Sequence, residues 1–373
     1  METYRLSSKI TEQDREYLIK TTNDAGLGTV RTTVFIDGVP AESLDNPHPV
    51  NIDAKEVLSL VKTTHEEKKR ELETVLRAYR QITPESDPQM LYNLGTAFFY
   101  KGFYNEAREL LEAVTKLDPD NHQALDFLGR TELARGDFKA AVAVGRKAVE
   151  EKPNYPDFRN NYAEALLADN QTDAAIEELE QAIRLNMYYS DAYYNLGLAK
   201  LLRLVTQPEP STFSADIQEA GDLFHRASLT YADLKGEAFS GAMEALKRHD
   251  LIQAMNMFQR VREEKKEQHR VEFASFYMRF VLHPELISEK AVADRIRFLE
   301  SELKRNPTYA DLLLELSHCY FEQAQLAWKN GLEKLRKTIE LNPSLSRVSE
   351  DAEAAEEVHS RICDLVKRLE DRG

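Results

Sequence analysis

The sequence predicts a mostly helical protein, built from repeated antiparallel helix pairs that follow a small β-rich module. The first observation is a period of 34 residues, which links Gly95 to Gly129 and Gly129 to Ala163 and indicates a solenoid. The second is the composition of the 373 residues: 42% are hydrophobic, 30% are charged, and only 14 are Gly and 13 Pro, as in soluble helix-rich proteins. The third is that residues 3–36 lack the period and contain short strand-forming runs.

Residues 1–50 form the predicted β-rich module. Runs rich in β-branched and aromatic residues cover 4–10, 17–22 and 29–36, and turn-forming residues separate them. These runs predict a small antiparallel meander, with room for a fourth short strand at Val39 and a loop over residues 40–49. A meander of this size must cover one apolar face with another element.

The segment 51–84 supplies a long helix, predicted over residues 54–82. Asp53 and Glu56 have the spacing of a helix N-cap pair. Further along, one set of positions recurs in steps of three and four, the spacing of a coiled-coil seam: Leu58, Val61, His65, Lys68, Leu72, Val75, Tyr79 and Ile82. Two interpretations stay open. The helix packs on the sheet or the first repeat, or it forms a dimer contact.

Residues 87–348 contain about seven predicted helix pairs, starting at Asp87-Pro88, an N-cap followed by a first-turn proline. Small residues recur where paired helices must approach closely, at Gly95, Gly129, Ala163 and Gly197, and at Ala107, Ala141 and Ala175. Gly102 and Gly136 allow tight turns, and Pro119 and Pro153 end the second helices. All of these residues are predicted to be structural.

The spacing of the repeats differs from 34 residues in several places. Eleven extra residues near 203–213, rich in Pro, Ser and Thr, predict an exposed loop, either a tolerated insertion or a docking or modification loop. The charged run 262–270 is predicted to be a solvated helix end. The sixth pair is divergent, with helices expected over 271–282 and 288–305, and the seventh pair recovers near Leu316 and Gly331. Residues 349–373 are predicted to form a C-terminal capping helix.

Charge and motif content exclude several functional classes. The net charge of −15 and pI near 5.2 repel phosphate backbones, so nucleic acid is not an expected partner. Cys319 and Cys363 are too few for a disulfide framework and have no zinc-ligand spacing. No cofactor, metal site or catalytic motif is predicted, since Gly26-Leu27-Gly28 lacks the third glycine of a nucleotide-binding loop.

The sequence contains no signal-peptide core and no run of about 18 apolar residues. We therefore expect a cytoplasmic protein without a membrane span.

Asn93-Leu94-Gly95, the turn glycines, Ala107 and Pro119 together resemble the tetratricopeptide repeat family, over about residues 87–345. The resemblance implies a right-handed superhelix in which the first helix of each pair lines a concave groove. In this family the groove binds extended peptides or helices of partner proteins. The module before residue 87 resembles no family that we can assign.

The resemblance also implies a set of groove residues. Family members often use an Asn before the Leu-Gly pair to hold a peptide backbone, and Asn93, Asn161 and Asn195 occupy that position here. A side-chain amide can both donate and accept hydrogen bonds, although the same amide can instead bond within the solenoid. The other predicted groove residues are Gln89, Tyr92, Gln123, Phe127, Arg130, Asn160, Tyr188 and Tyr194.

Groove chemistry separates this chain from family members that capture the carboxylate tail of a chaperone. Those members place Lys, Arg and Asn at positions where this chain has Tyr92, Gln123 and Asp157. Acidic residues along the groove favour a neutral or basic partner segment. Tyr188 and Tyr194 lie in an aromatic cluster that suits either a partner contact or core packing.

Two functional hypotheses follow. The first is a non-catalytic adaptor that binds a protein segment in the groove. The alternative is a self-assembling subunit that forms a homodimer through the N-terminal module and the 54–82 helix. No motif in the sequence supports an enzyme.

Overall fold

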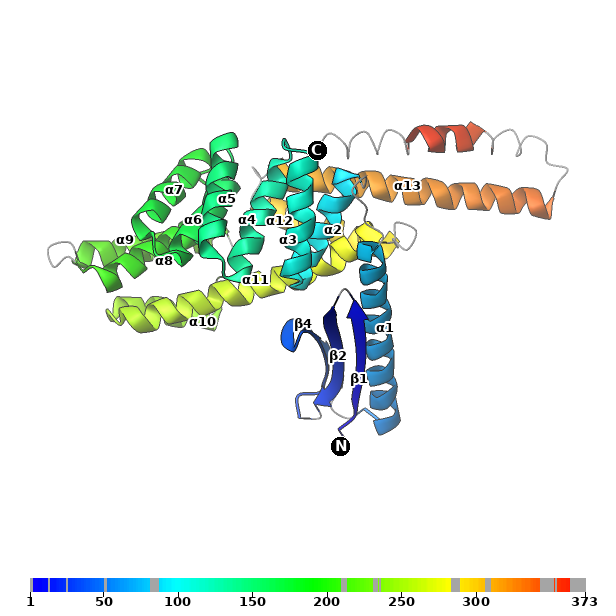
Figure 1. Ribbon diagram of the computed structural model, residues 1–373, viewed down its shortest axis with the longest axis horizontal. Helices are drawn as coiled ribbons and strands as arrows, with labels where there is room; N and C mark the ends of the chain where they lie inside the picture. The colour runs from blue at the N-terminus through cyan, green and yellow to red at the C-terminus, as the bar shows by residue number, and fades with distance from the viewer. Residues whose placement is uncertain are drawn as a thin grey trace.

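The computed structural model describes residues 3–12, 14–24, 26–49, 52–80, 87–208, 213–230, 234, 236–282, 289–305, 310–342, 352 and 354–362. A four-stranded antiparallel sheet and a long helix precede a curved array of helix pairs (Figure 1). The predicted fold class, a mostly helical solenoid behind a small β-meander, is confirmed.

The sheet consists of β1 (Arg5–Glu12), β2 (Arg15–Asp24), β3 (Thr29–Ile36) and β4 (Val39–Pro47), in the order β1-β2-β3-β4. The prediction of a loop over residues 40–49 is therefore wrong, because β4 occupies most of this segment. Its two prolines misled the prediction. Proline is tolerated on an edge strand, and a register shift between Val34 and Phe35 adjusts the pairing beside Pro40.

Helix α1 (Ala54–Arg80) lies across one face of the sheet and covers its apolar side chains. Most of the predicted seam is buried there, including Val61, His65, Leu72 and Val75. The His65 ring lies between the sheet hydroxyls, with Nε2 2.8 Å from Ser8 Oγ and Nδ1 3.0 Å from Thr21 Oγ1. The chain itself covers this seam, so the structure matches the first interpretation of the helix.

Consecutive antiparallel helices then build the solenoid. They are α2 (Pro88–Lys101), α3 (Tyr104–Leu117), α4 (His122–Arg135), α5 (Phe138–Glu151), α6 (Pro156–Ala168), α7 (Thr172–Leu185), α8 (Ser190–Thr206), α9 (Phe213–Thr230) and α10 (Glu237–Lys247). The predicted small residues do lie at close approaches: a Cβ atom added to Gly95 would lie 3.0 Å from the Leu111 side chain. Asp87 caps α2 by accepting a hydrogen bond of 3.0 Å from Met90 N.

The insertion near 203–213 lengthens helices as well as their connection. Helix α8 continues to Thr206, so residues 203–206 are helical and not part of an exposed loop as predicted. Residues 209–212 lie outside the described residues. The run Arg203-Leu204-Val205 contains no helix breaker, and Leu204 is buried, which explains why the helix continues.

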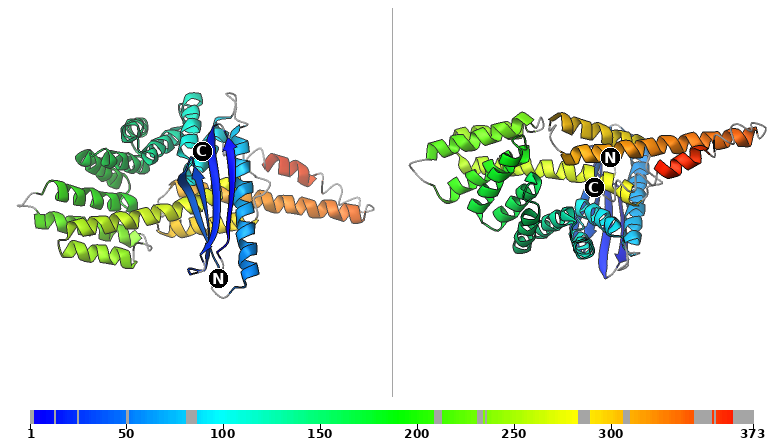
Figure 2. Two further views of the ribbon diagram at one scale, coloured as in Figure 1. Left: turned by 60° about the horizontal axis from the view of Figure 1, so that its bottom comes forward. Right: turned by 90° about the horizontal axis from the view of Figure 1, so that it is seen from above.

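Helix α11 (Leu251–Leu282) differs most from the prediction. It is one continuous helix of 32 residues, where the sequence suggested a solvated end at 262–270 and a separate helix after it. No Gly or Pro occurs between Leu251 and Leu282, so nothing local stops the helix. Its first half pairs with α10, and its second half leaves the pair and crosses the concave side of the solenoid to α2 (Figures 1 and 2).

The C-terminal part also departs from the predicted seventh helix pair. Helix α12 (Glu289–Arg305) packs on α13 (Ala310–Leu341), a single helix of 32 residues with Gly331 inside it. The turn of the seventh pair was expected between Leu316 and Gly331, but that segment contains no Gly or Pro, so nothing local stops the helix. Residues 354–362 are helical and lie along α13, where Trp328 Nε1 donates to Ala355 O over 3.0 Å. Residues 363–373 lie outside the described residues, and the capping role stays a prediction.

Candidate functional site

The concave side of the solenoid is lined by its first helices, α2, α4, α6 and α8, which lie next to one another in that order. Polar side chains link neighbouring first helices. Asn161 Nδ2 on α6 donates to both carboxylate oxygens of Asp126 on α4, over 2.9 and 3.0 Å. The same pattern repeats one pair later, so these amides hold successive repeats in register.

Asn195 on α8 is the second link in this series. Its Nδ2 donates to Asn160 Oδ1 and to Glu164 Oε1 on α6, each over 2.9 Å, and the residue is only 2% exposed. Asn93 on α2 accepts a hydrogen bond of 3.0 Å from Gln89 Nε2. All three predicted asparagines therefore have partners within the solenoid, and their role in holding a peptide backbone stays a prediction.

Aromatic rings fill the concave side between α2 and α4. The Phe127 ring packs edge-on against Tyr92, Phe99 and Tyr100, with ring centroids 5.6 to 6.0 Å apart. The Arg130 guanidinium stacks over this cluster, 4.4 Å from the Phe127 centroid and 4.9 Å from the Phe99 centroid. Three of the predicted groove residues, Tyr92, Phe127 and Arg130, thus form one packed cluster.

The remaining predicted residues are distributed differently. Tyr194 is buried, and its hydroxyl donates to Phe258 O of α11 over 2.8 Å. Tyr188 is 49% exposed and lies before the first turn of α8. Gln123 is exposed at the first turn of α4. The structure therefore brings most of the predicted residues together on the concave side and leaves Gln123 and Tyr188 at helix starts.

The concave side already holds a helix, the second half of α11. Lys265 Nζ lies 2.6 Å from Asp191 Oδ1 on α8, and Lys266 Nζ lies 2.5 Å from Glu164 Oε2 on α6. Further along, Arg270 Nη1 donates to Tyr100 O of α2 over 3.0 Å and to Ala41 O of β4 over 3.4 Å. Helix α11 thus joins α8, α6, α2 and the sheet.

The electrostatics of this contact favour the charged state of Glu164. Burial raises the pKa of this carboxyl, but Lys266 and Arg262 of α11, helped by the Asn195 amide, outweigh burial and hold the pKa at about 2. Glu164 therefore carries a full negative charge at neutral pH. An acidic concave side meets a basic helix face.

We did not predict from the sequence that α11 lies on the concave side of the solenoid. Arg262, Lys265, Lys266 and Arg270 recur at i, i+3, i+4 and i+8, which places them on one helix face. The acids between them, Glu263, Glu264 and Glu267, are exposed. This segregation of charge, together with the absence of Gly and Pro, was the available signal.

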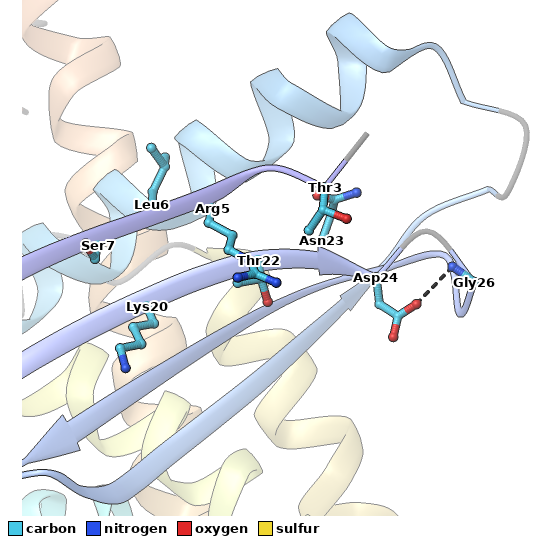
Figure 3. A pocket seen from close by; sticks show the side chains of 9 residues that line it. All are labelled: Thr3, Arg5, Leu6, Ser7, Lys20, Thr22, Asn23, Asp24 and Gly26. Carbon is cyan, nitrogen blue, oxygen red and sulfur yellow. Dashed lines mark hydrogen bonds between the residues drawn. The ribbon is translucent and has the colours of Figure 1, made fainter. Parts of the chain in front are cut away.

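The described part of the chain carries no metal-binding cluster and no membrane-spanning helix. No group of three or more His, Cys, Asp or Glu side chains there could hold a metal ion. None of the helices in the described ranges is long and apolar enough to cross a bilayer. A hollow of about 760 Å³ at the end of the sheet is open to solvent, and its lining includes the exposed Arg5 and Lys20 (Figure 3). It encloses no buried charge and so provides no defined binding site.

Two models of the tetratricopeptide repeat match the chain, one over residues 70–156 and one over residues 132–201. The match begins inside α1, earlier than the predicted start at Asp87. For residues 202–345 the resemblance stays a prediction. A search of curated proteins finds no match.

Several solved repeat structures are similar to the chain. The repeat protein TTC0263 of Thermus thermophilus is 17% identical, with 63% of this chain and 99% of that chain covered and a TM-score of 0.34. MamA of Desulfovibrio magneticus RS-1 is 21% identical, with 49% and 98% covered and a TM-score of 0.36. A tetratricopeptide repeat protein of Parabacteroides merdae is 16% identical, with 75% and 99% covered and a TM-score of 0.35. The assignment of the repeats depends on the two family models.

Proposed function

We propose that this chain, a tetratricopeptide repeat protein over residues 70–201, is a non-catalytic adaptor that binds a basic helical segment of a partner protein on its concave side. Solenoids of this type offer extended concave surfaces suited to such binding. The observation that carries the proposal is that Glu164 and Asp191 already bind a basic helix, the chain's own α11.

The geometry of α11 defines the partner that we expect. Its groove-facing cations are spaced at i, i+3, i+4 and i+8, so a partner helix needs Lys or Arg at those positions on one face. Its other face can be acidic, as in α11. This is the helix-in-groove mode of recognition, with charge in place of much of the usual apolar contact.

A partner helix would take the place of the second half of α11. The first half cannot leave easily, because Phe258 stacks on Phe224 with centroids 3.6 Å apart and is fully buried. The second half is held on α6 and α8 by two ion pairs, each with one exposed and one mostly buried partner. Lys266 is 44% exposed against 14% for Glu164, and Asp191 is 41% exposed against 16% for Lys265. A partner helix with the same cations can form the same ion pairs with Glu164 and Asp191, so it can take the place of this half of α11.

The test is direct binding of a labelled helical peptide that carries the basic stripe, measured by fluorescence anisotropy with the full chain. The matched control peptide has the same composition in scrambled order. We expect the striped peptide to bind. In a chain that also carries Lys265→Glu/Lys266→Glu, where α11 no longer forms these pairs, adding Glu164→Gln/Asp191→Asn should weaken peptide binding about tenfold, because two charge pairs are lost.

A second variant shows whether weak peptide binding to the wild type results from competition by α11 or from the absence of a binding site. In Lys265→Glu/Lys266→Glu the resident helix is repelled by Glu164 and Asp191, so the striped peptide should bind more tightly than to the wild type. Equal binding of striped and scrambled peptides to both proteins would refute the proposal.

The alternative, a self-assembling subunit, is not favoured through α1, because the apolar seam of that helix is covered inside the chain. The exposed face of α1 is charged, with Lys62, Glu66, Arg70 and Glu73 among its members. A different part of the N-terminal module does favour association.

A further inference from the structure

The outer edge of β1 offers a row of backbone hydrogen-bonding groups. Asn23 N donates to Tyr4 O over 3.3 Å, and bonded pairs alternate along an antiparallel ladder. The peptide groups of Leu6, Ser8, Ile10 and Glu12 therefore face β2. Those of Arg5, Ser7, Lys9 and Thr11 face outward, where the described part of the chain provides no further strand.

The opposite edge of the sheet is protected, and this contrast is informative. Strand β4 contains Pro40 and Pro47 and follows a register shift, and its outward carbonyl at Ala41 accepts from Arg270. Prolines, irregular pairing and covering groups are the usual ways of blocking an edge strand. Strand β1 has a regular register over its whole length and no proline. Its central cation, Lys9, is paired with Glu16 of β2.

We propose that the free edge of β1 pairs antiparallel with β1 of a second copy of this chain, centred on Ser8. The two sheets then join into one continuous sheet across a two-fold axis. Each outward peptide group finds a partner, since Arg5 lies opposite Thr11 of the second copy and Ser7 lies opposite its Lys9. The proposal is independent of the peptide-binding function.

When two copies of β1 pair, charge selects the register centred on Ser8. Hydrogen bonds between the two strands form only where a residue with an outward peptide group lies opposite another such residue. The nearest alternative registers that meet this condition are centred on Ser7 and on Lys9. A Ser7 centre places Arg5 opposite Lys9, and a Lys9 centre places Lys9 opposite itself. Like charges directly opposite destabilise a strand pair. The Ser8 centre places each cation opposite a hydroxyl.

The inner face of β1 is also self-complementary about Ser8. Leu6 and Ile10 are half-buried beside α1 and lie symmetrically on either side of Ser8. Figure 3 shows Leu6 on the α1 side of β1 and Arg5 on the other side. In the proposed pair Leu6 lies opposite Ile10 of the second copy, which covers both side chains further and makes a favourable apolar cross-strand contact.

The test compares Ser7→Pro with Ser43→Pro in the full chain by light scattering. Both serines are exposed, and both N–H groups face away from the sheet, on β1 and β4 respectively, so proline removes no ladder bond in either strand. We expect a dimeric wild type, a dimeric Ser43→Pro and a monomeric Ser7→Pro with an unchanged circular dichroism spectrum. A monomeric wild type, or a folded Ser7→Pro that stays dimeric, would overturn the proposal.

A second measurement fixes the register and does not depend on the folding of the proline variant. In the proposed pair the two Ser8 residues are a non-hydrogen-bonded pair, whose Cα atoms lie about 4.5 Å apart, within disulfide range. Ser8→Cys should give a covalent dimer on oxidation, and Ser43→Cys, although more exposed, should not. Both variants keep Cys319 and Cys363. Failure of Ser8→Cys to cross-link, or equal cross-linking of Ser43→Cys, contradicts the proposed register.

Discussion

Lys101 is a buried cation on α2, only 2% exposed, and it illustrates how single residues join the N-terminal module to the solenoid. Its Nζ lies 3.2 Å from Glu42 Oε2 of β4 and is also paired with Glu71 of α1. Lys68 of α1 contacts the same two carboxylates, over 3.0 and 2.9 Å. Two cations and two anions thus balance one another where three elements meet.

Removing one member of this cluster should be strongly destabilising. Lys101→Met keeps most of the length of the side chain but leaves Lys68 as the one ion-pair partner of Glu42 and Glu71 in this cluster. An uncompensated buried charge costs about 3–5 kcal/mol, and we expect a loss of that size in the free energy of urea unfolding. The control is Lys62→Met on the exposed side of α1, which should change stability by less than about 0.5 kcal/mol.

The pH dependence of the same variant distinguishes lost charge pairing from lost packing. Burial raises the pKa of Glu42 and Glu71, but Lys101 and Lys68 outweigh it and lower both below the ordinary value of 4.5. A carboxyl whose pKa is lowered by folding stabilises the folded state above pH 4.5. That stabilisation is lost as the pH falls from 4.5 through the lowered pKa. The difference in the free energy of unfolding between the wild type and Lys101→Met should therefore become smaller below pH 4.5. A difference that does not change with pH would indicate that Lys101→Met destabilises the fold through lost packing alone.

The residues that could be predicted from the sequence are those fixed by the repeat itself. Gly95 and Asn195 were predicted to lie on the solenoid from spacing alone, and they do. Their partners were not predictable, because Asn195 bonds to Asn160 and Glu164 in the preceding repeat. Such contacts depend on how one repeat is rotated on the next, which a single sequence does not encode in its period.

Helix α11 shows the corresponding limit for whole elements. Its first half continues the predicted array of helix pairs, and its side chains Ala254, Phe258 and Val261 are buried there. The second half looked like a solvated end, because its charges have no local partner. Those partners, Asp191 and Glu164, lie 74 and 102 residues away in the chain. Strand β4 was misjudged because its prolines were given too much weight. Helix α13 was misjudged because the repeat spacing predicted a turn in a segment without Gly or Pro.

If the ion pairs hold α11 on the solenoid, reversing their charges should loosen its second half. In Lys265→Glu/Lys266→Glu we expect the backbone amides of residues 262–282 to exchange hydrogen about tenfold faster, because like charges then face each other. Adding Glu164→Lys/Asp191→Lys to the same chain should restore slow exchange. The measurement is hydrogen exchange followed by mass spectrometry of the full chain.

The matched control is Arg260→Glu, on the same helix but 78% exposed and paired only with Glu264 of its own helix in the described contacts. Its exchange should remain that of the wild type. A similar rise in the control would show that any charge reversal frays α11, and failure of the fourfold variant to recover would show that the pairs do not hold it.

Across the whole molecule, the packing is continuous from the sheet into the first repeat. Tyr17 of β2 donates to Glu106 of α3 over 2.6 Å, and its ring lies 5.9 Å from that of Phe103. Leu72 of α1 and Phe98 of α2 belong to the same buried cluster. The predicted boundaries at 50 and 84 came from changes in composition, and a change in composition does not show whether two segments share a core. As a division into domains they stay a prediction.

The C-terminal helices form a separate and smaller unit. Val292, Ile296, Leu299 and Cys319 make their own buried cluster between α12 and α13, and α13 extends away from the solenoid (Figure 1). A small core resists unfolding less than a large one. Stability should therefore be lower here than in the repeats.

Leu299→Ala tests whether the two cores unfold independently. Leu299 is fully buried, so its truncation should cost about 2–5 kcal/mol, and the loss should appear as faster hydrogen exchange in α12 and α13 alone. Because distant sites without shared partners have additive effects, exchange in α4 to α7 should be unchanged. Leu179→Ala, an equally buried change inside the solenoid, should give the converse pattern. If either substitution accelerates exchange in both units by the same factor, the chain unfolds as one body and the small core is stabilised by the solenoid.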